Sequence, residues 1–218
     1  MKRKYKTILF DFDGTIADTK ECIISSFQKS LASFDLTPID EKELVSLIGK
    51  SLTEQVKILI PSDSSDIFYD TFVAKYRQVY AEESKTKLAV FKGVKKVLNS
   101  MWKKKIVMTI VSSKKESVLQ NDCKILNIEN YFDLLVGPDS VTHHKPHPES
   151  VHVSMKKLGI TNKASLLVIG DATFDIDMGN AASVDTCAVT WGVHSRNLLL
   201  SSKPTYIIDN VADLSKFI

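Results

Sequence analysis

The chain has 218 residues, of which 44% are hydrophobic and 25% charged, and its formal net charge is +3 at pH 7. This composition predicts a globular protein with one core, or with a core domain and a smaller second domain. The small net charge argues against a dedicated nucleic-acid binder, which usually carries a clustered basic face. No apolar run approaches the ~20 residues of a membrane span, so we expect no membrane partner.

The start of the chain and the cysteine pattern predict a cytoplasmic protein. The basic start of the chain precedes an apolar run of only Ile8 to Phe10, which is too short for the core of a signal peptide. Cys22, Cys123 and Cys187 are odd in number, widely spaced and in no CxxC pair. This pattern is typical of reduced thiols rather than of a disulfide framework.

The first predicted element is a strand over residues 7–10, which runs directly into Asp11, Asp13 and Gly14. Its near-continuous apolarity is typical of a strand buried on both faces of a parallel sheet. Strands disfavour aspartate and glycine, and two carboxylates this close repel each other. Residues that conflict with the strand preference at this position are typical of a functional site.

Residues 19 to about 86 contain no convincing strand, and their apolar spacing predicts a series of helices. Asp18 is the expected N-cap of the first helix, with Glu21 completing the capping pattern. Further helices are expected over 41–48 and 53–60, followed by a loop over 61–66. A last helix carries an aromatic stripe from Phe68 to Tyr80, which we interpret as core rather than as a substrate platform.

Short apolar runs then alternate with segments of helical period. The expected strands cover 106–111, 133–137, 165–170, 187–191 and 206–209. The alternation predicts βαβ units and an α/β fold with a doubly wound, Rossmann-like parallel sheet. We therefore expect a core domain over 1–17 and 87–218, with an all-helical domain inserted over 18–86.

Polar residues follow three of these strands, at the edge where open parallel sheets bind ligands. They are Asp11 and Asp13, Ser112 and Ser113, and Asp171 with Asp175, while Lys145 lies after the 133–137 strand. Several carboxylates in one crevice need a cation, and oxygen-only ligands favour Mg²⁺. A carboxylate is a competent nucleophile, and lysine, serine and close backbone N–H groups hold phosphoryl oxygens. The constellation predicts metal-assisted phosphoryl transfer.

Four motifs in this order resemble the haloacid dehalogenase-like (HAD) superfamily, in particular its phosphoglycolate-phosphatase-like branch with a helical cap. They are "DFDGT", "TIVSSK", "KPHPES" and "GDATFD", beginning at residues 11, 109, 145 and 170. The similarity runs over essentially the whole chain. The resemblance implies that the helical insert is a cap that closes over the site and selects the substrate.

The resemblance also implies a role for each matched residue. Asp11 is the implied nucleophile, and Asp13 the implied general acid and base, whose backbone carbonyl also binds the metal. Mg²⁺ is the implied cofactor, held by Asp11 and Asp171, with Asp175 acting directly or through water. The implied phosphate-binding groups are Ser112, the N–H groups of Ser113 and Gly14, and Lys145, which also neutralises the nucleophile.

Three positions depart from the family pattern. Ala172 stands where a small hydroxyl residue is common, Ser113 where asparagine is common, and Ser183 where glycine is usual. The alanine puts in doubt how well Asp171 is supported by hydrogen bonds, and with it the metal affinity.

Two further groups of residues allow more than one interpretation. His143, His144 and His147 are clustered as zinc ligands can be, but Pro146 and Pro148 exclude the helix that would place them on one face. We favour a loop flanking Lys145. In the helical insert, Lys50 follows Gly49 and is the better candidate for a substrate contact than Arg77.

The leading hypothesis is a Mg²⁺-dependent phosphatase that acts on a small phosphorylated metabolite through an aspartyl-phosphate. A phosphomutase on the same scaffold is the alternative, and a phospho-accepting signalling module or a non-catalytic phosphate-binding protein is a more distant one. The sequence leaves open whether the substrate resembles phosphoglycolate, pyrophosphate, a nucleotide or a sugar phosphate. It also leaves the oligomeric state open.

Overall fold

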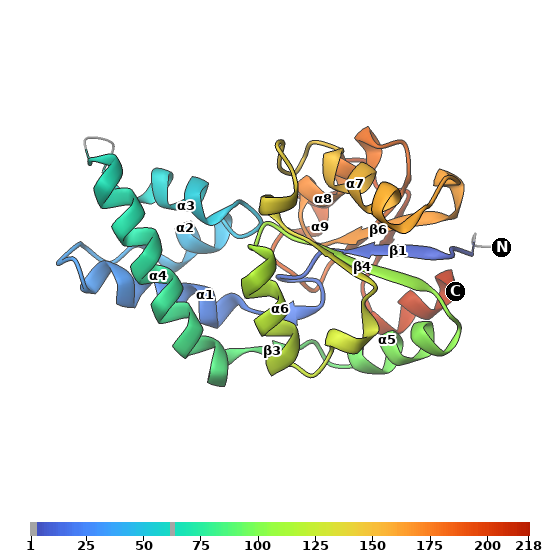
Figure 1. Cartoon of the computed structure of the whole chain (residues 1–218), viewed down its shortest axis with the longest axis horizontal. Helices are drawn as coiled ribbons and strands as arrows, with labels where there is room; N and C mark the ends of the chain where they lie inside the picture. The colour runs from blue at the N-terminus through green and yellow to red at the C-terminus, as the bar shows by residue number, and fades with distance from the viewer. Residues whose placement is uncertain (1–3, 62–63) are drawn as a thin grey trace.

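A computed structural model describes residues 4–61 and 64–218 (Figure 1). Six parallel strands form one sheet in the order β5-β4-β1-β6-β7-β8. The strands are β1 (Thr7–Phe10), β4 (Val107–Val111), β5 (Leu134–Val136), β6 (Leu166–Gly170), β7 (Asp185–Val189) and β8 (Tyr206–Ile208). Strand β1 lies at the centre, between β4 and β6, which confirms the predicted doubly wound α/β fold.

Helices cover both faces of this sheet. One face packs against α5 (Val94–Lys103), α6 (Glu116–Ile125) and the 3-10 segment η4 (Val211–Phe217). The other face packs against α7 (Glu149–Leu158), α8 (Thr173–Ala181) and α9 (Arg196–Ser201). The remaining short 3-10 turns are η1 (Glu129–Tyr131), η2 (Pro138–Ser140) and η3 (Lys163–Ser165).

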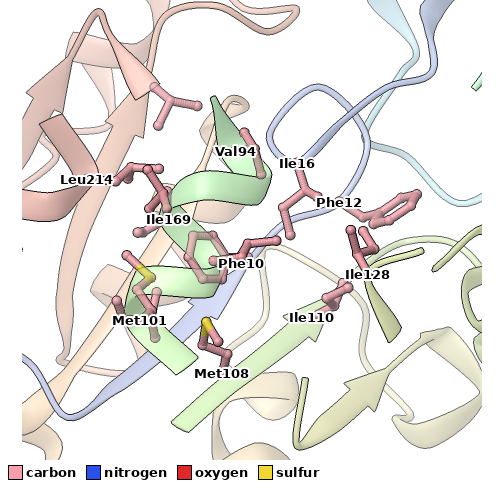
Figure 2. Packing of buried hydrophobic residues seen from close by; sticks show 14 of the residues in the cluster. Phe10, Phe12, Ile16, Val94, Met101, Met108, Ile110, Ile128, Ile169 and Leu214 are labelled. Atoms are coloured by element: carbon pink, nitrogen blue, oxygen red, sulfur yellow. The ribbon is translucent and has the colours of Figure 1, made fainter. Parts of the chain in front are cut away.

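The central strand supplies side chains to both layers, because successive residues of a strand point to opposite faces. Ile8 and Phe10 belong to the cluster under α5 and η4, whereas Leu9 belongs to the cluster under α7 and α8. Figure 2 shows Phe10 beside Ile169 and Met101 in the first cluster. This two-sided burial explains the near-continuous apolarity of the strand.

The predicted helical insert lies between β1 and β4 and forms the end of the molecule away from both termini (Figure 1). It contains α1 (Lys20–Ala32), α2 (Glu41–Ser46), α3 (Leu52–Leu59) and α4 (Asp66–Lys87). These helices share their own buried cluster, which includes Phe27, Leu44, Val56 and Phe72. The aromatic residues of α4 therefore pack in the core of the insert, as the stripe predicts.

The insert is connected to the sheet by two chain segments that pair with each other. Strands β2 (Ala17–Asp18) and β3 (Ala89–Val90) form an antiparallel two-stranded sheet. The predicted N-cap role of Asp18 is wrong, because its backbone pairs with Ala89 and Thr19 takes the N-cap position of α1. Glu21 instead forms an ion pair with Lys87, 3.1 Å away.

Other expectations differ from the structure in detail. Helix α2 ends at Ser46, and α4 begins at Asp66, inside the predicted loop, of which residues 62–63 lie outside the described residues. Ser183 has a φ of +59°, in the left-handed region that favours glycine, which explains the residue usual there. In the described part of the chain, no helix has both the length and the apolarity needed to cross a membrane.

Candidate active site

The carboxylate cluster consists of Asp11, Asp171 and Asp175, which lie just beyond β1 and β6. Strand pairing continues past the end of β1, where the Asp11 N–H donates to the Ile169 carbonyl at 2.8 Å. The three side chains each offer an oxygen atom, and these atoms lie within 4.8 Å of one another. All three residues are buried. The structure thus brings together three of the carboxylates that the sequence analysis selected.

Lys145 provides the positive charge closest to this cluster. Its Nζ lies 2.6 Å from Asp11 Oδ1 and 2.6 Å from Asp175 Oδ1, and its side chain is only 5% exposed. Burial alone would lower the pKa of Lys145, but the charges of Asp11 and Asp175 outweigh burial and raise it. The ammonium therefore stays charged and holds the two carboxylates together.

Asp171 is fully buried and is held by hydrogen bonds from two directions. The Thr15 hydroxyl donates to its Oδ1 at 2.7 Å, and the Val193 N–H donates to its Oδ2 at 2.8 Å. Ala172 therefore does not leave this carboxylate without support. Burial, together with the charge of Asp175, raises the pKa of Asp171 to about 7.

Gly14 is required by the close approach of Asp171. Its φ is +85°, and a Cβ placed on it would lie 2.3 Å from Asp171 Oδ2. Its N–H donates to the Ala17 carbonyl at 2.8 Å. The bond to Ala17 already occupies this donor, which counts against the predicted contact between the Gly14 N–H and a phosphate oxygen.

The two serines after β4 differ in their surroundings. Ser112 is buried, and its Oγ accepts a hydrogen bond from the Lys114 N–H at 3.2 Å. The Ser113 hydroxyl donates to the Gly49 carbonyl of the helical insert at 2.6 Å. Ser113 therefore links the sheet edge to the insert, while its N–H contact with phosphate stays a prediction.

Asp13 does not join the carboxylate cluster but belongs to a second group, which we call the Lys114 network. Lys114 Nζ lies 2.8 Å from Asp13 Oδ1, 2.8 Å from Asp122 Oδ2 and 2.6 Å from the Tyr80 hydroxyl. The Tyr80 hydroxyl also donates to Asp122 Oδ2 at 2.8 Å. The network connects the end of β1 with α6 of the core and α4 of the insert.

The motifs of the sequence do not identify Lys114, Asp122 or Tyr80 as part of the site. One usable signal lay in α6, where Asp122 stands three residues after Leu119 and beside Cys123, on the apolar face of the helix. A charged residue on a buried face needs a partner. The sequence does not reveal which lysine supplies it, because that pairing depends on how α6 packs against the end of β4.

A cavity of about 540 Å³ opens between the core and the helical insert. Asp11, Asp13 and Ser112 line its core side, and Lys50 and Arg77 line its insert side. Lys50 Nζ also lies 4.9 Å from the centre of the Phe174 ring, at the start of α8. Both predicted insert cations thus face the same space as the predicted nucleophile.

The histidines after β5 separate into two groups. His144 lines the cavity, whereas His143 and His147 lie beside Glu149 on the surface. The prolines prevent a helix here, as expected, yet the turn still brings two of the three rings together, with centres 4.5 Å apart.

Because Asp171 has a raised pKa, the metal-free protein is expected to lose stability as the pH rises. Between the unfolded pKa of 3.8 and the folded value of about 7, the folded state holds a proton that the unfolded state has released. Stability therefore falls with rising pH in this window and stays low above it. Thermal denaturation in a chelator should give a lower Tm at about pH 8 than at about pH 5. Asp171→Asn should reduce this difference in Tm. An undiminished difference would show that the raised pKa of Asp171 is not its cause.

Comparison with known proteins places this arrangement in a family. A model of haloacid dehalogenase-like hydrolases matches residues 8–189. Pyrophosphatase PpaX from Oceanobacillus iheyensis is 31% identical over 209 residues, covering 96% of this chain and 94% of that protein.

Solved structures share the fold over nearly the whole chain. A predicted phosphoglycolate phosphatase from Haemophilus somnus superposes with a TM-score of 0.89 at 23% identity, covering 97% of each chain. A haloacid dehalogenase-like family protein from Streptococcus pneumoniae gives a TM-score of 0.84 at 22% identity, covering 98% of each chain. The chain belongs to the haloacid dehalogenase-like hydrolases, which confirms the family and the enzyme class predicted from its motifs.

Proposed function

We propose that this protein is a Mg²⁺-dependent phosphatase that hydrolyses a small phosphorylated metabolite through an aspartyl-phosphate on Asp11. The observation that carries the proposal is the pair of 2.6 Å contacts from Lys145 to Asp11 and Asp175, beside Asp171. This arrangement places a nucleophilic carboxylate, which lines the cavity, in contact with a fixed positive charge and beside a set of metal ligands.

The residues present fit a magnesium ion. The donors are carboxylate oxygens, the ligand type that Mg²⁺ prefers. Asp11, Asp171 and Asp175 carry three formal negative charges, and Lys145 carries one positive charge. The remaining formal charge of −2 (three less one) would be balanced by one divalent cation. Bound Mg²⁺ would offset the repulsion between these carboxylates and the phosphoryl oxygens.

In the first proposed step, an oxygen of Asp11 attacks phosphorus and the bond from phosphorus to the leaving oxygen breaks. Asp13 donates a proton to that oxygen, so the leaving group departs with a hydroxyl at that position. Lys145 keeps Asp11 oriented and offsets the negative charge of the phosphoryl group. Ser112 lines the cavity where it can donate to a phosphoryl oxygen.

In the second step, Asp13 removes a proton from a water molecule, whose oxygen attacks phosphorus. The bond between phosphorus and Asp11 breaks, which releases phosphate, restores the Asp11 carboxylate and leaves Asp13 protonated, as it was before the first step. A catalytic role for Asp13 requires that its position be well defined, and its 2.8 Å contact with Lys114 supplies that restraint.

We propose that residues 18–86 form a cap domain on a core made of residues 1–17 and 87–218. The separate buried cluster of the insert supports this division, as does the paired β2 and β3 connection. Closure of the insert over the cavity would exclude water and place Lys50 near the part of the substrate away from phosphorus.

The relatives named pyrophosphatase make pyrophosphate one candidate substrate, and phosphoglycolate, nucleotide and sugar phosphates are the others. The experiment is a panel of these compounds and p-nitrophenyl phosphate, with phosphate release measured with Mg²⁺ and with chelator. We expect Mg²⁺-dependent release from at least one compound. Isomerisation of a sugar phosphate without net release would favour the phosphomutase instead, and no turnover on the whole panel would favour a binding protein.

Lys50→Ala is expected to change substrate preference rather than chemistry. A partly exposed ion pair contributes up to about 1 kcal/mol, so KM for a substrate with a second anionic group should rise about fivefold. The kcat for p-nitrophenyl phosphate, which lacks that group, should change little. Lys57→Ala, an exposed lysine on α3, is the matched control. An unchanged ratio of kcat/KM between the two substrates would exclude Lys50 as a substrate contact.

A further inference from the structure

Three potential metal ligands converge on the surface of the loop that carries Lys145. His143, His147 and Glu149 each offer one ligand atom, and these atoms lie within 4.8 Å of one another. His143 Nδ1 lies 2.9 Å from Glu149 Oε2, and His147 Nδ1 lies 4.0 Å from the same oxygen. The two imidazole side chains are 64% and 49% exposed, so the group is open to solvent.

The turn geometry accounts for this convergence. The His147 N–H donates to the His144 carbonyl at 2.9 Å, which folds the chain back after Lys145. Helix α7 then begins at Glu149, after Pro148 at the N-cap. The prolines that exclude a helix over the histidines are therefore part of the turn that brings His147 toward His143.

Glu149 is held in place before any ligand arrives. Its Oε1 accepts from the Thr142 N–H and its Oε2 from the His143 N–H, both at 2.9 Å. These bonds, together with His143, lower the pKa of Glu149 to about 2, so the carboxylate is charged at neutral pH.

Two imidazole nitrogens and one carboxylate oxygen are a donor set typical of zinc sites that leave a fourth position open to water. Tetrahedral geometry with ligands at about 2.0–2.1 Å separates neighbouring donor atoms by about 3.3 Å. The observed separations of 2.9 and 4.0 Å lie on either side of that value. His147 Nδ1 accepts a 3.3 Å hydrogen bond from the Glu149 N–H, so its lone pair points toward the backbone nitrogen of Glu149. An ion bound at Nδ1 would replace this hydrogen bond.

We propose that His143, His147 and Glu149 form a surface site for Zn²⁺ or a chemically similar divalent transition ion. The site is separate from the carboxylate cluster, and it does not depend on the proposed phosphatase activity. Its ligands flank Lys145 on both sides, so a bound ion joins the two ends of the loop that places the ammonium between Asp11 and Asp175. Occupancy therefore stabilises the folded chain.

The test uses the full chain without a histidine tag, stripped of metal and then saturated with Mg²⁺ to fill the carboxylate cluster. Calorimetric titration with Zn²⁺ should give a single site per chain, and Zn²⁺ should raise the Tm by several degrees. His143→Asn/His147→Asn should bind at least about tenfold more weakly while keeping the wild-type fold and Tm without zinc. His152→Asn, which changes an exposed histidine of α7, should bind as the wild type does.

Two further measurements separate this site from the carboxylate cluster. Asp171→Asn should leave the zinc stoichiometry unchanged, and Co²⁺ should give the intense visible absorption of a four-coordinate ion, which the double histidine variant should lose. If zinc binding disappears in Asp171→Asn and persists in the double histidine variant, the ion belongs to the carboxylate cluster and the proposal is wrong. The absence of any zinc site in the Mg²⁺-saturated wild type would overturn it as well.

Discussion

Asp11→Asn is expected to lower kcat by at least about 10⁴-fold on every substrate that the protein turns over, because the amide cannot serve as the nucleophile. The substitution keeps the shape of the side chain and removes one of the three formal negative charges beside Lys145. Lys145 keeps its 2.6 Å contact with Asp175, so the buried ammonium still has a partner. We therefore expect the variant to fold, and its loss of activity to reflect chemistry alone.

The measurement is steady-state phosphate release with Mg²⁺, together with acid quenching after mixing with radiolabelled substrate. The wild type should retain label on the protein, and Asp11→Asn should not. Asp70→Asn is the matched control, because it makes the same change at an exposed aspartate on α4. Wild-type turnover in Asp11→Asn, or label that persists in it, would falsify the assignment of the nucleophile.

The part of the site that could be predicted from the sequence consists of residues next to strand ends. A buried strand has to be apolar, so the appearance of Asp11 directly after Phe10 indicates the sheet edge without any tertiary information. The same reasoning applies to Asp171, which follows Gly170 at the end of β6. The parallel order of the strands then brings both carboxylates to one place.

The part of the fold and of the site that could not be predicted from the sequence depends on contacts between helices and strands. Asp18 matches a capping pattern, yet β2 pairing with β3 determines its conformation, and that pairing involves residues about seventy positions away. The partner of Asp13 is equally hidden, because Lys114 reaches it only through the packing of α6 and α4 around the end of β4. Local patterns record which residues are buried, whereas ion pairs depend on which buried surfaces meet.

Lys114→Met is expected to lower both stability and activity, because Lys114 is the positive charge of a buried network. Methionine keeps most of the volume and the apolar stem. It leaves the Asp122 carboxylate, whose side chain is 0% exposed, with the Tyr80 hydroxyl as its remaining contact at Oδ2. Removing one partner of a buried ion pair costs about 3–5 kcal/mol. Asp13 loses its restraint, so kcat should fall about 100-fold, within the range of general acid–base catalysis.

Urea denaturation and steady-state kinetics measure the two effects, and a second substitution separates them. Adding Asp122→Asn to Lys114→Met removes the uncompensated buried charge and should recover most of the free energy of unfolding. It does not restore the restraint on Asp13, so kcat should stay low. Lys115→Met, at the exposed neighbouring lysine, should change stability by less than about 0.5 kcal/mol. If kcat and the free energy of unfolding both recover fully in the double variant, Lys114 stabilises the fold but does not position Asp13.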